Sequence, residues 1–264
     1  MSTLLATFYM STQESLIDTF RALHRQGDPI VLFNIWDAGS ARSVIQAGAK
    51  ALATGSAPVA MAQGFPDGEK MPLELALANI NRIIATTDLP VTMDLEGGYG
   101  EHEATIEQTV REAISTGIVG FNFEDQIVGG EGLYSIDTQV KRIASARRAA
   151  DKGSVKPFIN ARTDIFLKAK PDTHNDGMLS EAIERARAYA QAGADGFFAP
   201  GLADEILIER LCKEVDLPVN IIALPHVPEK SVLTKLGVSR ISYGPVPYRA
   251  MMKALGESAA AAFS

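Results

Sequence analysis

The sequence predicts a (β/α)8 barrel, built as one domain over residues 1–264, and three features support this fold class. Eight short apolar runs recur along the chain. Longer segments separate them, and their apolar residues lie three and four positions apart, which is the spacing of an amphipathic helix. Several of these segments end in a small residue followed by glycine, a pair that often closes a helix before the chain returns to a sheet.

The apolar runs are the expected strands. Strands that alternate with helices form a parallel sheet, because parallel neighbours need a crossover connection, and eight such units close naturally into a barrel. The competing fold is an open doubly wound sheet, but no G-x-G-x-x-G motif follows the first run, where a dinucleotide site would show it. The expected strands are Ile30–Ile35, Ala51–Thr54, Pro90–Met93, Val119–Phe123, Pro157–Asn160, Gly196–Ala199, Pro218–Ile222 and Arg240–Tyr243.

The segments between the strands are the expected crossover helices. Ile136–Ala150 and Ser180–Gln191 show the helical spacing most clearly. We also expect an N-terminal helical segment within residues 1–28 and a C-terminal helix over residues 246–264. The glycines expected to close helices are Gly48, Gly117, Gly193 and Gly237.

Composition excludes several classes of protein. The formal net charge is -7 and no stretch gathers Lys and Arg into a block, so nucleic-acid binding is not expected. The single cysteine, Cys212, excludes an intramolecular disulfide and a thiolate zinc site. Residues 1–28 hold no long apolar run, so neither a signal peptide nor a membrane span is expected, and we place the protein in the cytoplasm.

Acidic residues follow two neighbouring strands at the end where a barrel of this kind places its active site. Asp94 and Glu96 follow the third strand, and Glu124 follows the fourth. Because Asp94 and Glu96 are two positions apart, their side chains point the same way, and Glu124 can converge with them. Oxygen ligands without nearby His or Cys favour a hard cation, so the sequence predicts bound Mg2+, with Mn2+ as the alternative.

These acids could instead cap the helices that follow, because loops before helices often end in Asp or Glu, and Asp125 by itself fits a cap better. Arg162 follows the fifth strand beside the expected ion. Its guanidinium suits a substrate carboxylate or the charge of an enolate, although an ion pair with Asp164 is the plainer interpretation. No lysine lies at a strand end, which disfavours a Schiff-base aldolase.

Five ordered motifs resemble those of the isocitrate lyase and phosphoenolpyruvate mutase superfamily, and the similarity extends from Asn34 to Leu255. One of them is similar to a D-x-D-x-G-Y-G metal motif, with Glu in place of the second Asp. The loop residue Asp67 matches a further aspartate of the family. The motifs are Asn34–Arg42, Thr54-Gly55-Ser56, Asp94–Gly100, Glu124-Asp125-Gln126 and Ala161-Arg162-Thr163-Asp164.

The resemblance implies a role for each matched residue. Asp94, Glu96 and Glu124 would hold Mg2+ directly or through water, while Arg162, Asp67 and Glu124 would take part in catalysis. It also implies a homo-oligomer, a dimer or a tetramer, in which C-terminal helices are exchanged. The residues expected to contact the substrate are Trp36, Ser56, Ala57, Gly97, Arg162 and Asn220.

The segment after the fourth strand departs from the family. Residues 127–133 contain no Lys, Cys or His, so they lack the K-[KR]-C-G-H segment of the lyases and the K-T-N-S lid of the mutase. The expected activity is therefore a Mg2+-dependent lyase that cleaves or forms a carbon-carbon bond next to the carbonyl of a small 2-oxo acid, through an enolate. The alternatives are a carbon-phosphorus bond enzyme, of the phosphonopyruvate hydrolase or phosphoenolpyruvate mutase type, and a non-catalytic barrel that binds 2-oxo acids.

Overall fold

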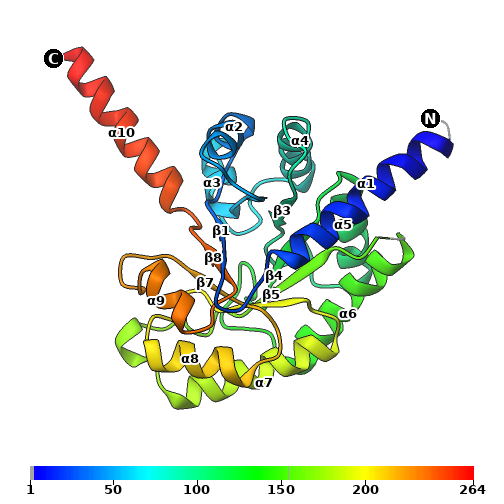
Figure 1. The fold of residues 1–264 in the computed structure, drawn as a ribbon, viewed down its shortest axis with the longest axis vertical. Helices are drawn as coiled ribbons and strands as arrows, with labels where there is room; N and C mark the ends of the chain where they lie inside the picture. Colours follow the sequence, from blue (N-terminus) through cyan, green and yellow to red (C-terminus); the bar gives the residue numbers. More distant parts are fainter. Residues whose placement is uncertain (1–2, 154) are drawn as a thin grey trace.

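Eight parallel strands form one sheet that curves into a barrel (Figure 1). The computed structural model describes residues 3–153 and 155–264. The strands lie in the order β1-β8-β7-β6-β5-β4-β3-β2, and a parallel bridge between Ile35 and Thr54 joins the two outer strands. The eight-unit barrel predicted from the sequence is confirmed. The strands are β1 (Ile30–Leu32), β2 (Leu52–Ala53), β3 (Val91–Asp94), β4 (Gly120–Glu124), β5 (Phe158–Arg162), β6 (Gly196–Phe198), β7 (Val219–Ile222) and β8 (Arg240–Ser242).

Three strands run further than their apolar runs predict. The expected β3, β4 and β5 end at an apolar residue or at Asn160, whereas the observed strands include Asp94, Glu124 and Arg162. The register explains the extension, since Asp94 lies opposite Asn122 and Glu124 lies opposite Arg162 in the parallel ladder. The polar residues expected just beyond these strands are therefore held by the sheet itself.

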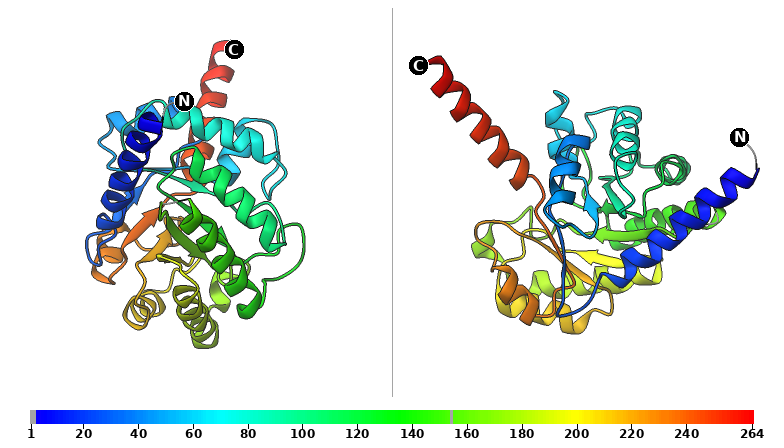
Figure 2. Two further views of the ribbon diagram at one scale, coloured as in Figure 1. Left: turned by 90° about the vertical axis from the view of Figure 1, so that its right-hand side faces the viewer. Right: turned by 45° about the horizontal axis from the view of Figure 1, so that its top comes forward.

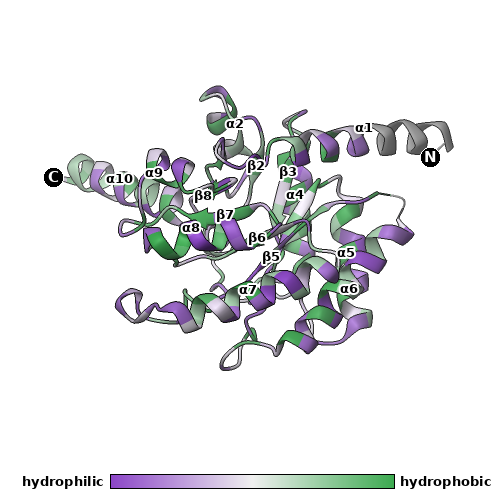
Figure 3. Cartoon of the chain, turned by 60° about the horizontal axis from the view of Figure 1, so that its bottom comes forward, coloured by the Kyte–Doolittle hydropathy of each residue, from purple (hydrophilic) through white to green (hydrophobic). Residues whose placement is uncertain are grey.

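Helices cover the outside of the barrel, and green apolar residues occur beside purple polar ones along helices α5 to α8 (Figure 3). Each glycine expected to close a helix has a positive φ, between 92° and 105°, which a residue with a side chain rarely adopts. The helices are α1 (Thr3–Ala22), α2 (Ala38–Gln46), α3 (Ser56–Ala62), α4 (Leu73–Ile84), α5 (Glu103–Ser115), α6 (Ile136–Lys152), α7 (Asp176–Gln191), α8 (Glu205–Glu214), α9 (Lys230–Lys235) and α10 (Val246–Phe263), with a 3-10 turn at Pro171–Thr173.

The end of α1 and the residues after it close the amino-terminal end of the barrel. The His24 ring stacks on Phe158, the first residue of β5, with the ring centroids 4.3 Å apart. Phe20 is fully buried and meets Phe158 edge-on at 5.5 Å. Burial is the main reason that the pKa of His24 falls to about 3, so the ring is neutral at ordinary pH. An aromatic plug therefore fills this end of the barrel.

Beyond its first turn, the last helix, α10, does not pack on the barrel. It extends away from the strands in both views of Figure 2. Met251, Leu255 and Phe263 on this helix are 54%, 62% and 89% exposed, respectively. Such a row of exposed apolar side chains on one helix is typical of a surface that contacts another protein.

Candidate active site

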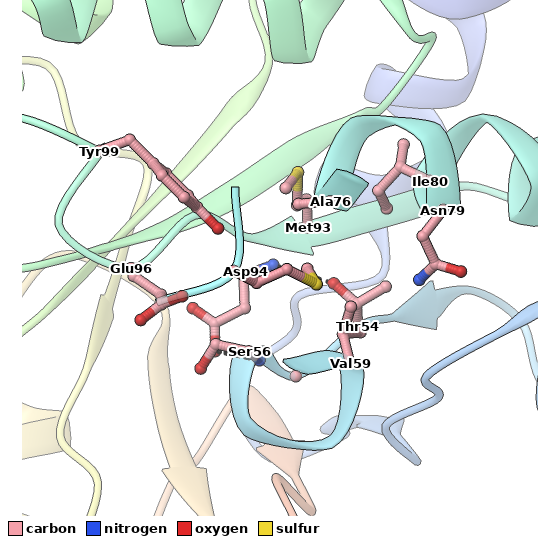
Figure 4. Close-up of a pocket in the computed structure, with 12 residues that line it drawn as sticks. Thr54, Ser56, Val59, Ala76, Asn79, Ile80, Met93, Asp94, Glu96 and Tyr99 are labelled. Carbon is pink, nitrogen blue, oxygen red and sulfur yellow. Dashed lines mark hydrogen bonds between the residues drawn. The ribbon is translucent and has the colours of Figure 1, made fainter. Parts of the chain in front are cut away.

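Carboxylates gather at the carboxyl-terminal end of β3 and β4. Asp94 is the last residue of β3 and Glu124 the last of β4, while Glu96 lies two residues beyond Asp94. The side chains of Asp94 and Glu96 turn toward the same space beside Ser56 (Figure 4). None of the three caps the helix that follows it, because α5 begins after His102 and α6 after Ser135. The helix-cap alternative is therefore wrong for these acids.

Burial and mutual repulsion make this end of the barrel unfavourable for negative charge. Glu96 and Glu124 are 6% and 3% exposed. Burial, followed by the charges of Asp94 and Asp67, raises the pKa of Glu96 to about 8. Burial also raises the pKa of Glu124 and of Asp94, although Arg162 acts in the opposite direction on both. Asp67 is exposed on its loop, yet its charge reaches all three acids.

One oxygen of Asp94 supports a cation at this place. Its Oδ2 accepts a hydrogen bond from the backbone N–H of Ser56 at 3.3 Å, whereas its Oδ1 is buried without a partner among the described residues. A buried carboxylate oxygen is costly unless it is paired or binds a metal. Across residues 3–153 and 155–264, no three acidic, His or Cys side chains are close enough to ligate one ion directly. Mg2+ commonly takes one or two carboxylates and several waters, so the donor set fits this ion.

Arg162 lies between two carboxylates. Its Nη1 is 2.9 Å from Glu124 Oε2, and its Nε and Nη2 donate to the two oxygens of Asp164 at 2.6 and 2.8 Å. The expected pairing with Asp164 is thus present. A guanidinium carries five N–H donors, and these contacts engage three of them. The remaining two have no partner among the described residues, and the side chain keeps 14% of its surface exposed.

The loops that carry the acids have unusual backbone conformations. Glu69, Glu96 and Tyr99 have φ values of 55°, 52° and 56°. Each such residue costs roughly 1–3 kcal/mol and persists only where its surroundings hold it. The backbone N–H of Glu69 donates to Glu96 Oε2, and that of Tyr99 donates to Glu69 Oε1, each at 2.8 Å. The loop of Asp67 and the loop of Glu96 are therefore locked together.

Glu69 belongs to the site but was not among the residues predicted from the sequence. A carboxylate directly after the turn-forming residues Pro66-Asp67-Gly68 was the available signal. The helix-cap role expected for Asp125 is wrong. Asp125 is fully buried, and its Oδ1 accepts from the backbone N–H of Asp164 at 3.0 Å while its Oδ2 accepts from the Tyr189 hydroxyl at 2.9 Å. Asp125 fixes the ends of β4 and β5 relative to each other.

Some of the residues expected to contact the substrate lie beside the acidic residues, and others do not. Ser56 and Ala57 begin α3 beside Asp94, and Gly97 follows Glu96. Trp36 is half-buried, and its ring meets Tyr248 of α10 edge-on at 5.2 Å. Asn220 lies inside the barrel, where its Oδ1 accepts from the Ser242 hydroxyl at 3.2 Å. In the part of the chain that the structure covers, neither Trp36 nor Asn220 hydrogen-bonds to the carboxylates.

No helix among the described residues is long and apolar enough to span a bilayer. Known proteins share the fold and have similar sequences. A solved structure from Burkholderia cenocepacia, provisionally named a phosphonomutase, is 48% identical, with a TM-score of 0.90 over 93% of this chain and 97% of the other. An uncharacterized protein of Mycobacterium tuberculosis is 32% identical over 92% of this chain and 88% of its own length.

The probable 2-methylisocitrate lyase 2 of Corynebacterium glutamicum is 31% identical over 68% of this chain and 57% of its own length. The model of the phosphoenolpyruvate phosphomutase family matches residues 20–263. The match covers all eight strands and the loops that carry the acidic residues. This chain therefore belongs to the phosphoenolpyruvate phosphomutase family.

Proposed function

We propose that this protein is a Mg2+-dependent lyase that cleaves or forms a carbon-carbon bond next to the carbonyl of a small 2-oxo acid, through an enolate. The observation that carries the proposal is a buried oxygen of Asp94 without a partner among the described residues, at the same end of the barrel as Arg162, whose described contacts leave two N–H donors unused. The lyase name of the Corynebacterium relative supports this reaction class.

Asp94 would hold the ion directly, and Glu96 and Glu124 would hold it through water, with Mn2+ as the other ion that suits these donors. When bound, the ion supplies Lewis acidity toward the carbonyl oxygen of the substrate. Asp67 is the loop carboxylate that would complete the polar surroundings, since its charge already acts on the three acids. The protein's own groups perform the remaining tasks.

Arg162 would face the oxygen on which charge develops. When the bond to the carbon beside the carbonyl breaks, its electron pair moves toward that oxygen and an enolate forms. The two free N–H donors of Arg162 would stabilise this charge, while Glu124 and Asp164 hold the guanidinium in place. Ser56 and Ala57 would bind the substrate carboxylate, and Trp36, Gly97 and Asn220 would complete the substrate contacts.

Calorimetry with oxalate, which mimics the enolate, tests the site without turnover. We expect oxalate to bind in the presence of Mg2+ and not in its absence. Turnover is tested with a panel of oxaloacetate, a 2-methylmalate-type acid and phosphonopyruvate, with pyruvate release as the measurement. Mg2+-dependent oxalate binding with no pyruvate release from any of them, and with no conversion of phosphonopyruvate to phosphoenolpyruvate, would favour the non-catalytic barrel.

Carbon-phosphorus chemistry is the second candidate, and one observation favours it. The Burkholderia structure, which shares 48% of its residues with this chain, carries a phosphonomutase name. Cleavage or rearrangement of phosphonopyruvate, with no reaction of oxaloacetate or the 2-methylmalate-type acid, would establish this alternative. Hydrolysis would release phosphate together with pyruvate, whereas rearrangement would release neither and would yield phosphoenolpyruvate, which is measured directly.

We also propose that the protein is a homo-oligomer that exchanges α10. In a (β/α)8 barrel the last helix normally covers the gap between the last and first strands. Here α10 leaves, and a groove of about 680 Å3 lies beside β1 and α2, lined in part by Val31, Phe33 and Val44. Light scattering on the full chain should show a dimer or tetramer, and deletion of residues 249–264 should give a smaller species. A monomeric full chain would contradict the exchange.

A further inference from the structure

Arg142, on α6, is a buried cation that has no role in the proposed chemistry. It is 3% exposed and forms no ion pair with a carboxylate in the described structure. Its Nη1 donates to the carbonyl oxygens of Gly100 and Glu101 at 3.1 and 3.3 Å, and its Nη2 donates to that of Gly97. A buried guanidinium is costly unless its donors are satisfied, and here three carbonyls of one loop satisfy them. Arg142 therefore binds the loop that follows Asp94 and Glu96.

The same turn of α6 also contacts β4. Arg142 Nε donates to Gln139 Oε1 at 3.0 Å, and Gln139 Nε2 donates to the carbonyl oxygen of Glu124 at 3.0 Å. Gln139 is fully buried. Through this pair, one helix holds the backbone at the end of β4 and the loop after β3 at a set distance from each other.

The segment after β4 reaches the same place from the other side. Residues 126–133 form a loop closed by an antiparallel bridge between Gln126 and Leu133. Tyr134 follows, and the guanidinium of Arg142 lies over its ring, 4.2 Å from the centroid. Within the loop, Val128 packs on Gly97 so closely that a methyl group on Gly97 would lie 2.9 Å from Val128 Cγ2. The loop thus covers Gly97, and its base rests on Arg142.

We infer that Arg142 is a positioning residue that joins the acidic loop after β3 to the covering loop of residues 126–133, so that the two loops are ordered together. Hydrogen bonds to three carbonyls hold the first loop, and stacking on Tyr134 holds the base of the second. The inference rests on the proposed function only where it treats Asp94 and Glu96 as metal-binding residues. The coupling of the two loops is independent of that assignment.

The test uses Arg142→Lys, which keeps the charge but loses the planar fork, and Tyr134→Leu, which removes the stacking alone. Arg148→Met is the matched control, because Arg148 lies on the same helix but pairs with Glu103 on the surface. Binding of Mn2+, followed by electron paramagnetic resonance, reports on the acidic loop. Amide hydrogen exchange in residues 126–134 reports on the covering loop.

For Arg142→Lys we expect Mn2+ affinity to fall about tenfold, the usual effect of removing a group that orients metal-binding residues. We also expect exchange in residues 126–134 to rise by about tenfold or more. Tyr134→Leu should raise exchange in that loop and leave Mn2+ affinity within about twofold of the wild type, and Arg148→Met should change neither.

A folded Arg142→Lys variant with wild-type Mn2+ affinity and wild-type exchange would overturn the inference. So would a loss of thermal stability with no change in either measurement, because that is the result of a purely structural role. If the wild-type protein itself binds no Mn2+, the proposed function fails, and the exchange measurement alone decides whether Arg142 joins the two loops.

Discussion

The residues at the two ends of the barrel have different roles: one end stabilises the fold and the other carries the candidate active site. At the amino-terminal end, Phe20, His24 and Phe158 pack as an aromatic plug, and His24 stays neutral. At the carboxyl-terminal end, Glu96 has a left-handed backbone, and one buried oxygen of Asp94 has no partner within the part of the chain that the structure describes. Aromatic packing at the amino-terminal end stabilises the folded state. The strained backbone and the buried carboxylate at the carboxyl-terminal end destabilise it, but they form the candidate active site. Stability and chemistry are therefore separated along the barrel axis.

Asp94→Asn should give the largest effect on activity. The amide cannot supply a charged ligand, so we expect turnover to fall by roughly a thousandfold, the order expected when a major charge-stabilising contact is lost. Thermal stability should stay equal or rise, because a buried carboxylate is removed. Asp204→Asn is the control, since Asp204 caps α8 and asparagine caps equally well. A large loss of stability in Asp94→Asn would contradict the separation of roles.

Phe20→Ala should give the largest effect on stability. Removing a fully buried ring costs about 3–5 kcal/mol of unfolding free energy, measured by urea denaturation. The turnover number per folded molecule should not change, because the plug lies at the other end of the barrel. Phe263→Ala removes a ring that is 89% exposed in α10 and should leave the stability of one subunit almost unchanged.

Acid should destabilise the protein through the plug. The pKa of His24 is about 3 in the folded protein, below its ordinary value of 6.5, so the unfolded chain binds more protons between these values. The stability that the neutral ring provides is complete above pH 6.5 and is lost as the pH falls toward 3. Urea midpoints at pH 7, 6 and 5 should show this slope, and His24→Leu should flatten it. His102→Gln, at an exposed site, should keep the slope of the wild type.

A rise in pH should destabilise the metal-free protein at the other end, and we place this effect last because bound Mg2+ should remove it. The folded pKa of Glu96 is about 8, above its ordinary value of 4.5, so the folded protein holds more protons in that interval. Without metal, stability should fall as the pH rises from 4.5 to 8. Glu96→Gln should reduce this slope, and Mg2+ should reverse it in the wild type. An identical slope in both proteins would contradict the assignment.

The sequence predicts the barrel and the acidic end for the same reason. Parallel strands bring their carboxyl ends to one rim, so residues such as Asp94, Glu124 and Arg162 meet although they are far apart in the chain. Glu69 and Arg142 could not be found in this way. Their roles arise from contacts with backbone atoms of a distant loop, and no spacing in the sequence encodes these contacts.

The closing of the sheet has a consequence for synthesis of the chain. Strand β1 pairs with β8, so Ile30 can pair only after Arg240 has been synthesised. Asn34 Oδ1 likewise accepts from the backbone N–H groups of Tyr243 and Gly244 at 2.9 and 2.8 Å. Until the ribosome has released these residues, β1 and β7 remain unpaired edges, which are templates for aggregation. A nascent chain that stalls before residue 240 is thus a natural client for chaperones.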